Sequence, residues 1–256
     1  MKLFYALILT VFAALPARAE VDIQPVTSPG GITAWLVEEH SIPFVALEIR
    51  FRGGASLDAP GKRGAINLMT GLLEEGAGDM DARAFSRETE ALATNLSFDV
   101  SDDSLSVSAR FLTENREASI ELLRAALLEP RFDEDAVERV RGQVISNIQS
   151  NQKDPNDIAR QTFDKIAFGD HPYGSSLNGT LETVAGLTRD DLIEAHSAVL
   201  ARDRIYVGAV GDITPEELGK LLDTLLDDLP AKGAPMPPRA DVDIPAGTTV
   251  VDFATP

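Results

Sequence analysis

The sequence of 256 residues contains no cysteine and only three histidines, His40, His171 and His196. The missing cysteines exclude disulfide bonds and thiolate metal sites. Basic residues are also few, because 23 Lys and Arg stand against 41 Asp and Glu, for a formal net charge of −18. An acidic surface repels phosphate groups, so we expect neither nucleic acid nor an anionic membrane surface as a partner.

Long apolar runs are also missing, except for one at the N-terminus. Lys2 precedes the apolar run Leu3–Leu15, and Ala17, Arg18 and Ala19 follow as an A-x-A cleavage site. A membrane anchor is the alternative, but a run of about 13 residues is too short, since a spanning helix needs about 20. The pattern therefore predicts that residues 1–19 are a cleaved secretory signal. We expect an exported protein of bacterial type, located in the periplasm and free of the membrane after cleavage.

The remaining chain mixes strand and helix patterns. The clearest strand is 44–52, in which Val45, Leu47, Ile49 and Phe51 alternate with shorter or charged residues. Apolar periodicity and capping signals predict the other elements. The expected strands are 22–27, 32–38, 44–52, 95–100, 104–111 and 204–210, and the expected helices are 64–76, 81–93, 115–128, 134–152, 157–168, 188–201 and 214–229. This order predicts an α+β fold, with a mixed, largely antiparallel sheet and helices packed mainly on one face.

Domain boundaries follow from composition. Residues 20–229 form the predicted α+β domain. Four prolines and a glycine within 230–238 are typical of a linker, and 248–253 has the pattern of a new strand. We therefore interpret residues 230–256 as a linker followed by the beginning of a second half that is missing from this sequence.

The helix expected over 64–76 carries one narrow polar stripe. Its apolar residues cover most of the helical wheel, which indicates burial on nearly all sides. Asn67, Thr70 and Gly71 lie at i, i+3 and i+4 and share one face, and Glu74 would continue the stripe at i+7. A buried helix of this kind points its stripe at a cavity, a cleft or another polar helix.

This arrangement resembles the active-site helix of the pitrilysin/insulinase-type zinc peptidases. That family carries the inverted motif H-x-x-E-H, in which two His hold zinc and the Glu acts as a base. The resemblance extends over about residues 32–229 and includes His171-Pro172-Tyr173-Gly174 and the helix beginning at Asp133. It implies the insulinase-like metallohydrolase fold, for the N-terminal half of such a protein.

The same resemblance argues against catalysis. The three motif positions fall on Asn67, Thr70 and Gly71, and the family's third metal ligand, a Glu on a later helix, falls on Asn147. Zinc prefers imidazole, thiolate or carboxylate ligands, and a Thr hydroxyl is no general base at neutral pH. We therefore expect no catalytic residue, no metal and no cofactor, with these four positions as a degenerate site. A wrong alignment, with an ordinary core helix here, is the alternative.

Three functions remain open at this point. The favoured hypothesis is a non-catalytic subunit of a periplasmic two-chain zinc peptidase, forming a heterodimer with an active H-x-x-E-H chain and part of the peptide-binding chamber. The alternative is a non-enzymatic periplasmic protein that holds extended peptides or serves as a scaffold. A self-sufficient zinc metallopeptidase is the third, and the three histidines would then have to supply the metal site.

Other polar residues have structural interpretations. His171 is expected to be a turn residue held by hydrogen bonds. His196 follows Glu194 at i+2, which is the wrong spacing for a helical ligand pair. Glu74, Glu75, Asp79 and Asp81 could serve acid–base chemistry, but solvation of helix ends is the simpler interpretation. Asp223, Asp227 and Asp228 are expected to form a solvated helix face.

Overall fold

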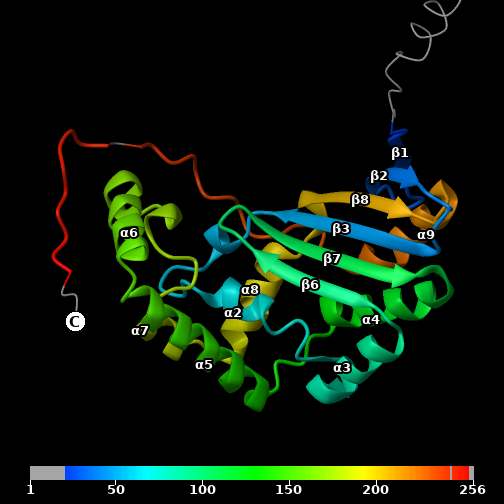
Figure 1. The fold of residues 1–256 in the computed structure, drawn as a ribbon, viewed down its shortest axis with the longest axis horizontal. Coiled ribbons are helices and arrows are strands. Elements are labelled where there is room, and N and C mark those ends of the chain that lie inside the picture. Colours follow the sequence, from blue (N-terminus) through cyan, green and yellow to red (C-terminus); the bar gives the residue numbers. More distant parts are fainter. Residues whose placement is uncertain (1–20, 243, 254–256) are drawn as a thin grey trace, which may run out of the picture.

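The computed structural model describes residues 21–242 and 244–253, so the predicted signal segment lies outside the described residues. A six-stranded sheet, in the order β1-β2-β8-β3-β7-β6, forms one layer, and α2, α8 and α4 lie against one side of it (Figure 1). Its strands are β1 (Gln24–Thr27), β2 (Thr33–Glu38), β3 (Phe44–Arg52), β6 (Asn95–Val100), β7 (Ser104–Leu112) and β8 (Ile205–Gly211). Only the β2–β8 pair is parallel. The predicted α+β class and layer arrangement are confirmed.

Alternation in β3 explains why the sheet has one buried face. Val45, Leu47, Ile49 and Phe51 are buried, whereas Arg50 between them is exposed. Successive strand side chains point to opposite faces, so the apolar set enters the core together. The helices fill the other side of this core with leucine and valine side chains.

Apart from α2, which ends early, and α7, which was not predicted, the helices begin and end close to their predicted positions. They are α2 (Ala65–Thr70), α3 (Ala82–Ala91), α4 (Arg116–Leu128), α5 (Glu134–Asn151), α6 (Pro155–Phe168), α7 (Leu181–Ala185), α8 (Arg189–Val199) and α9 (Pro215–Leu226). Reciprocal capping boxes open α8 at Thr188 and α9 at Thr214, as predicted. Short pairs β4 (Gly76–Ala77) and β5 (Met80–Asp81) precede α3, and 3-10 turns include η1 (Ala55–Leu57) and η3 (Pro172–Gly174).

The structure differs from the prediction in three local details. The helix expected over 64–76 ends at Thr70, because Gly71 forms its C-cap and the next N–H groups of Leu72 and Leu73 make tighter i→i−3 bonds. Glu74 therefore does not continue the polar stripe. Helix α7 was not expected, although Thr180 and Thr183 form a capping box at its start. Asp133 holds the N-cap position of α5 without accepting a capping bond, because its carboxylate pairs with Arg131.

The proline-rich segment 230–238 lies on the domain as a strap. The Ala234 N–H donates to the Ala198 carbonyl at 2.9 Å, and the Arg204 guanidinium donates to the Ala234 carbonyl at 2.8 Å. The Pro238 carbonyl lies 3.0 Å from His171 Nε2. These bonds fix the segment over the α8 end of the domain, so it is more ordered than a free linker. Residues 248–253 form no strand in the described structure.

No helix within residues 21–242 and 244–253 combines the length and apolar character that a bilayer crossing requires.

The pKa values of two histidines are shifted in opposite directions, which provides a test of the fold by its pH dependence. The Asp212 carboxylate, 2.7 Å from His40 Nδ1, raises the pKa of His40 above 6.5, and Glu38 adds to the effect. Burial lowers the pKa of His196 below 6.5, opposed by its 2.8 Å bond to the Leu127 carbonyl. Protonated His40 therefore stabilises the fold below pH 6.5, and this contribution is lost as pH rises through its folded pKa. Neutral His196 stabilises it above pH 6.5, and that contribution is lost as pH falls.

We expect His40→Asn to lower the melting temperature more in the acid range than at alkaline pH, and His196→Gln to show the reverse dependence. Thermal unfolding of the wild type and both variants, across buffers on either side of pH 6.5, measures this. Parallel curves for His40→Asn and the wild type would contradict the role given to Asp212.

Candidate functional site: a degenerate metal centre

A buried carboxylate holds the start of helix α2. Asp58 lies in the loop after β3, and its two oxygens accept the N–H groups of Gly64 at 2.9 Å and Ile66 at 2.8 Å. Gly64 has φ 97°, and a Cβ there would lie 2.7 Å from the Asn178 carbonyl oxygen. Burial raises the pKa of Asp58, and the Ile66, Gly64 and Arg63 donors oppose that rise. Asp58 thus caps the helix from a distance and satisfies N–H groups that the chain would otherwise leave unpaired.

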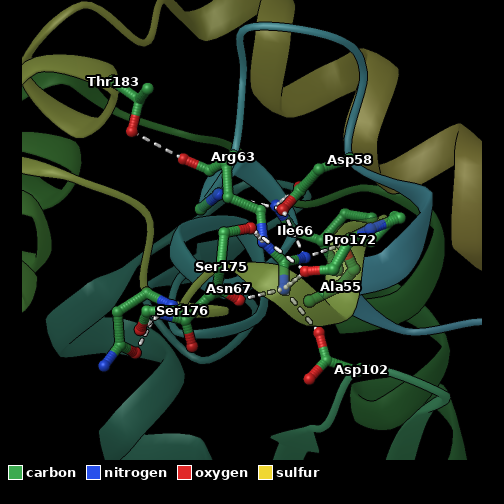
Figure 2. A network of polar contacts seen from close by, with 12 residues as sticks. Ala55, Asp58, Arg63, Ile66, Asn67, Asp102, Pro172, Ser175, Ser176 and Thr183 are labelled. Carbon is green, nitrogen blue, oxygen red and sulfur yellow. Dashed lines mark hydrogen bonds and ion pairs between the residues drawn. The ribbon is translucent and has the colours of Figure 1, made fainter. Parts of the chain in front are cut away.

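The Arg63 guanidinium lies at the centre of a polar network beside this cap (Figure 2). It reaches Asp58 at 3.4 Å and Asp102 at 2.5 Å, and Asp102 belongs to the β6–β7 turn. It also donates to the carbonyls of Ala55, Pro172 and Ser175. One side chain therefore joins the β3–α2 loop, the hairpin turn and the loop around η3.

The three motif positions have different surroundings. Asn67 is half-buried, and its Nδ2 donates to Asn178 Oδ1 at 3.2 Å. Thr70 is buried, and its hydroxyl donates to the Ile66 carbonyl at 2.7 Å within the same helix. Gly71 is exposed. The stripe thus gives one amide engaged with a loop, one hydroxyl engaged with its own backbone, and one position without a side chain.

Helix α5 brings the fourth position to the same side of the molecule. A Cβ on Gly71 would lie 3.1 Å from Val140 Cγ1 of α5, so the two helices are close there. Asn147 lies two turns beyond Val140 and is exposed, and its Oδ1 accepts from Gln143 Nε2 at 3.3 Å. Buried Arg141 ties α5 to the end of α7 through the carbonyls of Val184 and Leu187. The two helices of the predicted site are therefore neighbours.

This arrangement offers little to a metal ion. Within residues 21–242 and 244–253, no group of three or more His, Asp or Glu side chains is placed to bind one. The two amides would compete only weakly for a divalent cation, because zinc favours imidazole and carboxylate. The four positions themselves offer only amides, one hydroxyl and a bare backbone.

The three histidines lie apart from this site. His40, at the end of β2, contacts Asp212 and Glu38. His171 accepts the Tyr173 N–H at 3.3 Å through Nδ1, which confirms its predicted role in a turn. His196 is on α8 and contacts the Leu127 carbonyl.

The carboxylates near the helix end also have structural partners. Glu75 pairs with Arg139 of α5, and Asp81 caps α3 by accepting the Ala84 N–H at 2.7 Å. Glu74 is exposed, yet partial desolvation together with Glu75 and Asp99 raises its pKa.

The expected solvated face of α9 is only partly correct. Asp223 accepts the Gly30 N–H at 3.0 Å, whereas Asp227 and Asp228 pair with Arg202 and Arg124.

Sequence reasoning missed the residues that hold the site together: Asp58, Arg63, Arg141 and Asn178. Most of their partners are far away along the chain, as with Asn67 and Asn178, which are 111 residues apart. Asp58 is the exception, because it accepts the N–H groups of Gly64 and Ile66. A local pattern carries no signal for the distant pairs. The one available hint was the polar loop just before the helix.

Comparison with known proteins decides the family. The family model "Insulinase (Peptidase family M16)" matches residues 34–181. The chain belongs to the insulinase family. A second model, "Peptidase M16 inactive domain", matches residues 186–253. The predicted membership is therefore confirmed, in its catalytically degenerate form.

Several relatives and solved structures are similar to this M16 chain. The "Non-peptidase homolog YmxG" of Helicobacter pylori is 27% identical over 229 residues, covering 90% of this chain and 52% of that protein. An "Uncharacterized zinc protease" of Mycobacterium leprae is 25% identical, covering 80% of this chain and 46% of that protein. The fold matches a peptidase M16 inactive domain from Pseudomonas fluorescens, with a TM-score of 0.78 and 23% identity, covering 88% of this chain and 54% of that one. The M16 chain thus spans about half the length of the curated relatives it matches. The assignment of the four degenerate positions stays a prediction.

The Arg63 network gives a stability prediction for the site. In Arg63→Leu, the 3%-exposed Asp58 carboxylate loses its cation, and three carbonyls lose a donor. Removing one partner of a buried ion pair costs about 3–5 kcal/mol, so the free energy of unfolding, measured in urea, should fall by that amount. Exposed Arg87, which forms no ion pair among the described residues, is the control, and Arg87→Leu should change the free energy of unfolding by less than about 0.5 kcal/mol. Equal effects of the two variants would refute the role of Arg63.

Gly71 gives a second prediction. Its φ of −67° suits any residue, so Ala there should stabilise by about 0.4–1 kcal/mol through reduced unfolded-state entropy. Val140 Cγ1, 3.1 Å from the added Cβ, opposes this gain. We expect Gly71→Ala to stabilise a Val140→Ala background more than the wild type, in urea unfolding. If the two backgrounds responded alike, the contact between α2 and α5 at this point would be disproved.

Proposed function

We propose that this chain is the non-catalytic subunit of a two-chain zinc peptidase of the M16 family, working in the periplasm beside an active H-x-x-E-H chain. One observation carries the proposal. Helices α2 and α5 are neighbours, yet the predicted metal positions on them hold Asn67, Thr70, Gly71 and Asn147. The fold is retained while the chemistry is replaced by neutral polar groups.

The surface around Gly71 suits a chamber wall. Gln143 and Asn147 are exposed on α5 and offer amide donors and acceptors, while Gly71 leaves the backbone accessible. Amides bind peptide backbone without adding charge, and none of the four positions carries a carboxylate that would compete for the partner's zinc. The name of the Helicobacter pylori relative, "Non-peptidase homolog", agrees with a role without catalysis.

The location rests on the N-terminus. Residues 1–19 combine a positive start, an apolar run and an A-x-A site, which supports export to the periplasm. A periplasmic subunit would meet its active partner after both have been exported.

A peptide-holding scaffold is the second candidate, favoured by the sheet edge. β6 is the last strand in the sheet order, and it borders α2. The free edge of such a strand can pair with an extended peptide through backbone hydrogen bonds. In this role the chain would bind peptides without any partner chain.

Metal content and activity separate these functions. The purified chain should contain no stoichiometric zinc by metal analysis and should cleave no peptide. Cleavage should arise when an active M16 chain is co-purified with it. Gln143→Lys with Asn147→Lys should lower kcat/KM of that pair and leave its zinc content unchanged, because the substitutions act on the wall and not on the metal.

The other outcomes are equally clear. Stoichiometric zinc with EDTA-sensitive cleavage by the chain alone would establish a self-sufficient peptidase and refute the proposal. If the chain alone bound peptides and did not increase the peptidase activity of any active M16 chain, the result would favour the scaffold.

A further inference from the structure

The side of the sheet that faces away from the helices carries an exposed apolar surface. We call it the open face, and it comprises outward side chains of β2, β8, β3 and β7. Trp35 is 54% exposed, Tyr206 49% and Val210 45%. Exposed aromatic and β-branched side chains on one continuous sheet face mark a surface that packs against something else.

A trough runs across the open face. It has a volume of about 400 Å³ and lies above the small residues Ala46 and Gly208. A Cβ added at Gly208 would meet nothing within 4 Å, so the space above this residue is open. The register places Trp35 beside Gly208, and Arg110 beside Ala46. Trp35 therefore forms one wall. Glu48, which pairs with Gly208 from the other side and accepts the Ser108 hydroxyl, lies opposite it, and Arg110 is one residue pair further along the sheet.

A second apolar surface lies on α6. Ala159, Phe163 and Ile166 are spaced at i, i+4 and i+7 and are all exposed, Phe163 by 50% and Ile166 by 38%. The other side of α6 packs against η3, where Ala167 is buried and Phe168 meets the Tyr173 ring edge-on. The helix thus has one face fixed to the domain and one apolar ridge facing outward.

Within one chain the ridge and the trough do not meet. Figure 1 shows α6 beyond the ends of β3 and β7, apart from the helices beneath the sheet. The lining of the trough includes positions of β2, β3, β7 and β8 and the residue Ile23, which precedes β1, but no residue of α6. A ridge and a trough that cannot meet in one molecule can meet between two.

We propose that two copies of this chain form a symmetric dimer in which α6 of each copy packs into the trough of the other. Phe163 enters between Trp35 and Arg110, where an aromatic ring gains both an edge-to-face contact and a cation–π contact. Ile166 covers Val210. We place the two contacts across a twofold axis, so that the ridge and the trough of both copies are filled and the assembly stops at two chains.

Charge favours the same partner. The chain is strongly acidic, yet Arg50 and Arg110 project from the open face and form no ion pair among the described residues, while the Glu48 carboxylate in the trough accepts the Ser108 hydroxyl. Asp164, next to Phe163 on α6, likewise has no ion-pair partner in residues 21–242 and 244–253. The dimer brings Asp164 to the edge of the trough, beside these arginines. An opposite charge there offsets part of the repulsion between two acidic chains.

The dimer uses none of the four degenerate positions, so the test of the dimer is independent of the test of the proposed function. Its first test is the mass of the purified chain by sedimentation equilibrium at 0.15 M salt. Phe163→Glu on the ridge and Val210→Glu on the open face should each weaken the dimer by about tenfold or more, the loss expected when a buried anchor is removed. Ile193→Glu, at a 41%-exposed site on α8, is the control and should leave the dimer intact.

Mixing the two variants distinguishes this contact from other dimers. A mixed pair of Phe163→Glu and Val210→Glu chains retains one intact ridge and one intact trough facing each other. It should therefore dimerise more strongly than either variant alone. A sheet-to-sheet dimer would be unaffected by Phe163→Glu, and that result would overturn the proposal.

The absence of native cysteine allows a direct crosslink. Ile166→Cys and Val210→Cys, prepared as separate chains and mixed under oxidising conditions, should give a disulfide-linked dimer that neither chain gives alone in comparable yield. A monomeric wild type up to millimolar concentration, or a dimer that survives both glutamate variants, would overturn the proposal.

Discussion

The site depends on one guanidinium group. Arg63 holds the Asp58 carboxylate, the Asp102 turn and the loop around η3 together, and Asp58 in turn caps α2. Three segments separated by up to 112 residues are thus joined by a side chain that is 13% exposed. In a buried place such a charge is tolerated only because carboxylates and carbonyls surround it. The position of the degenerate helix follows from this network.

The network also explains how the fold can persist without a metal. In a metal site, bonds from two helices to one ion fix those helices against each other. Here Asn67 bonds to Asn178, Thr70 bonds within its own helix, and Gly71 packs close to Val140. Each polar group left by the missing ligands is satisfied or solvent-exposed, so none carries the cost of a buried, unpaired group. These contacts hold α2 and α5 together through protein groups.

Two segments, the strap 230–238 and helix α6, lie at the periphery of the domain. The strap 230–238 is bonded across α8 and η3, and it leaves the domain near Pro238 at a defined place. Helix α6 projects beyond the sheet with an apolar ridge, and the sheet has a trough on its open face.

The sequence alone predicted much of the secondary structure. Alternation in 44–52 predicted β3 to the residue, and the boxes at Thr188 and Thr214 predicted two helix starts, because period and capping act over a few residues. The polar stripe of Asn67, Thr70 and Gly71 came from the same short-range geometry. The early end of α2, the Arg63 network and the Asn67–Asn178 bond were decided by tertiary structure, because each depends on segments that meet only after the chain has folded.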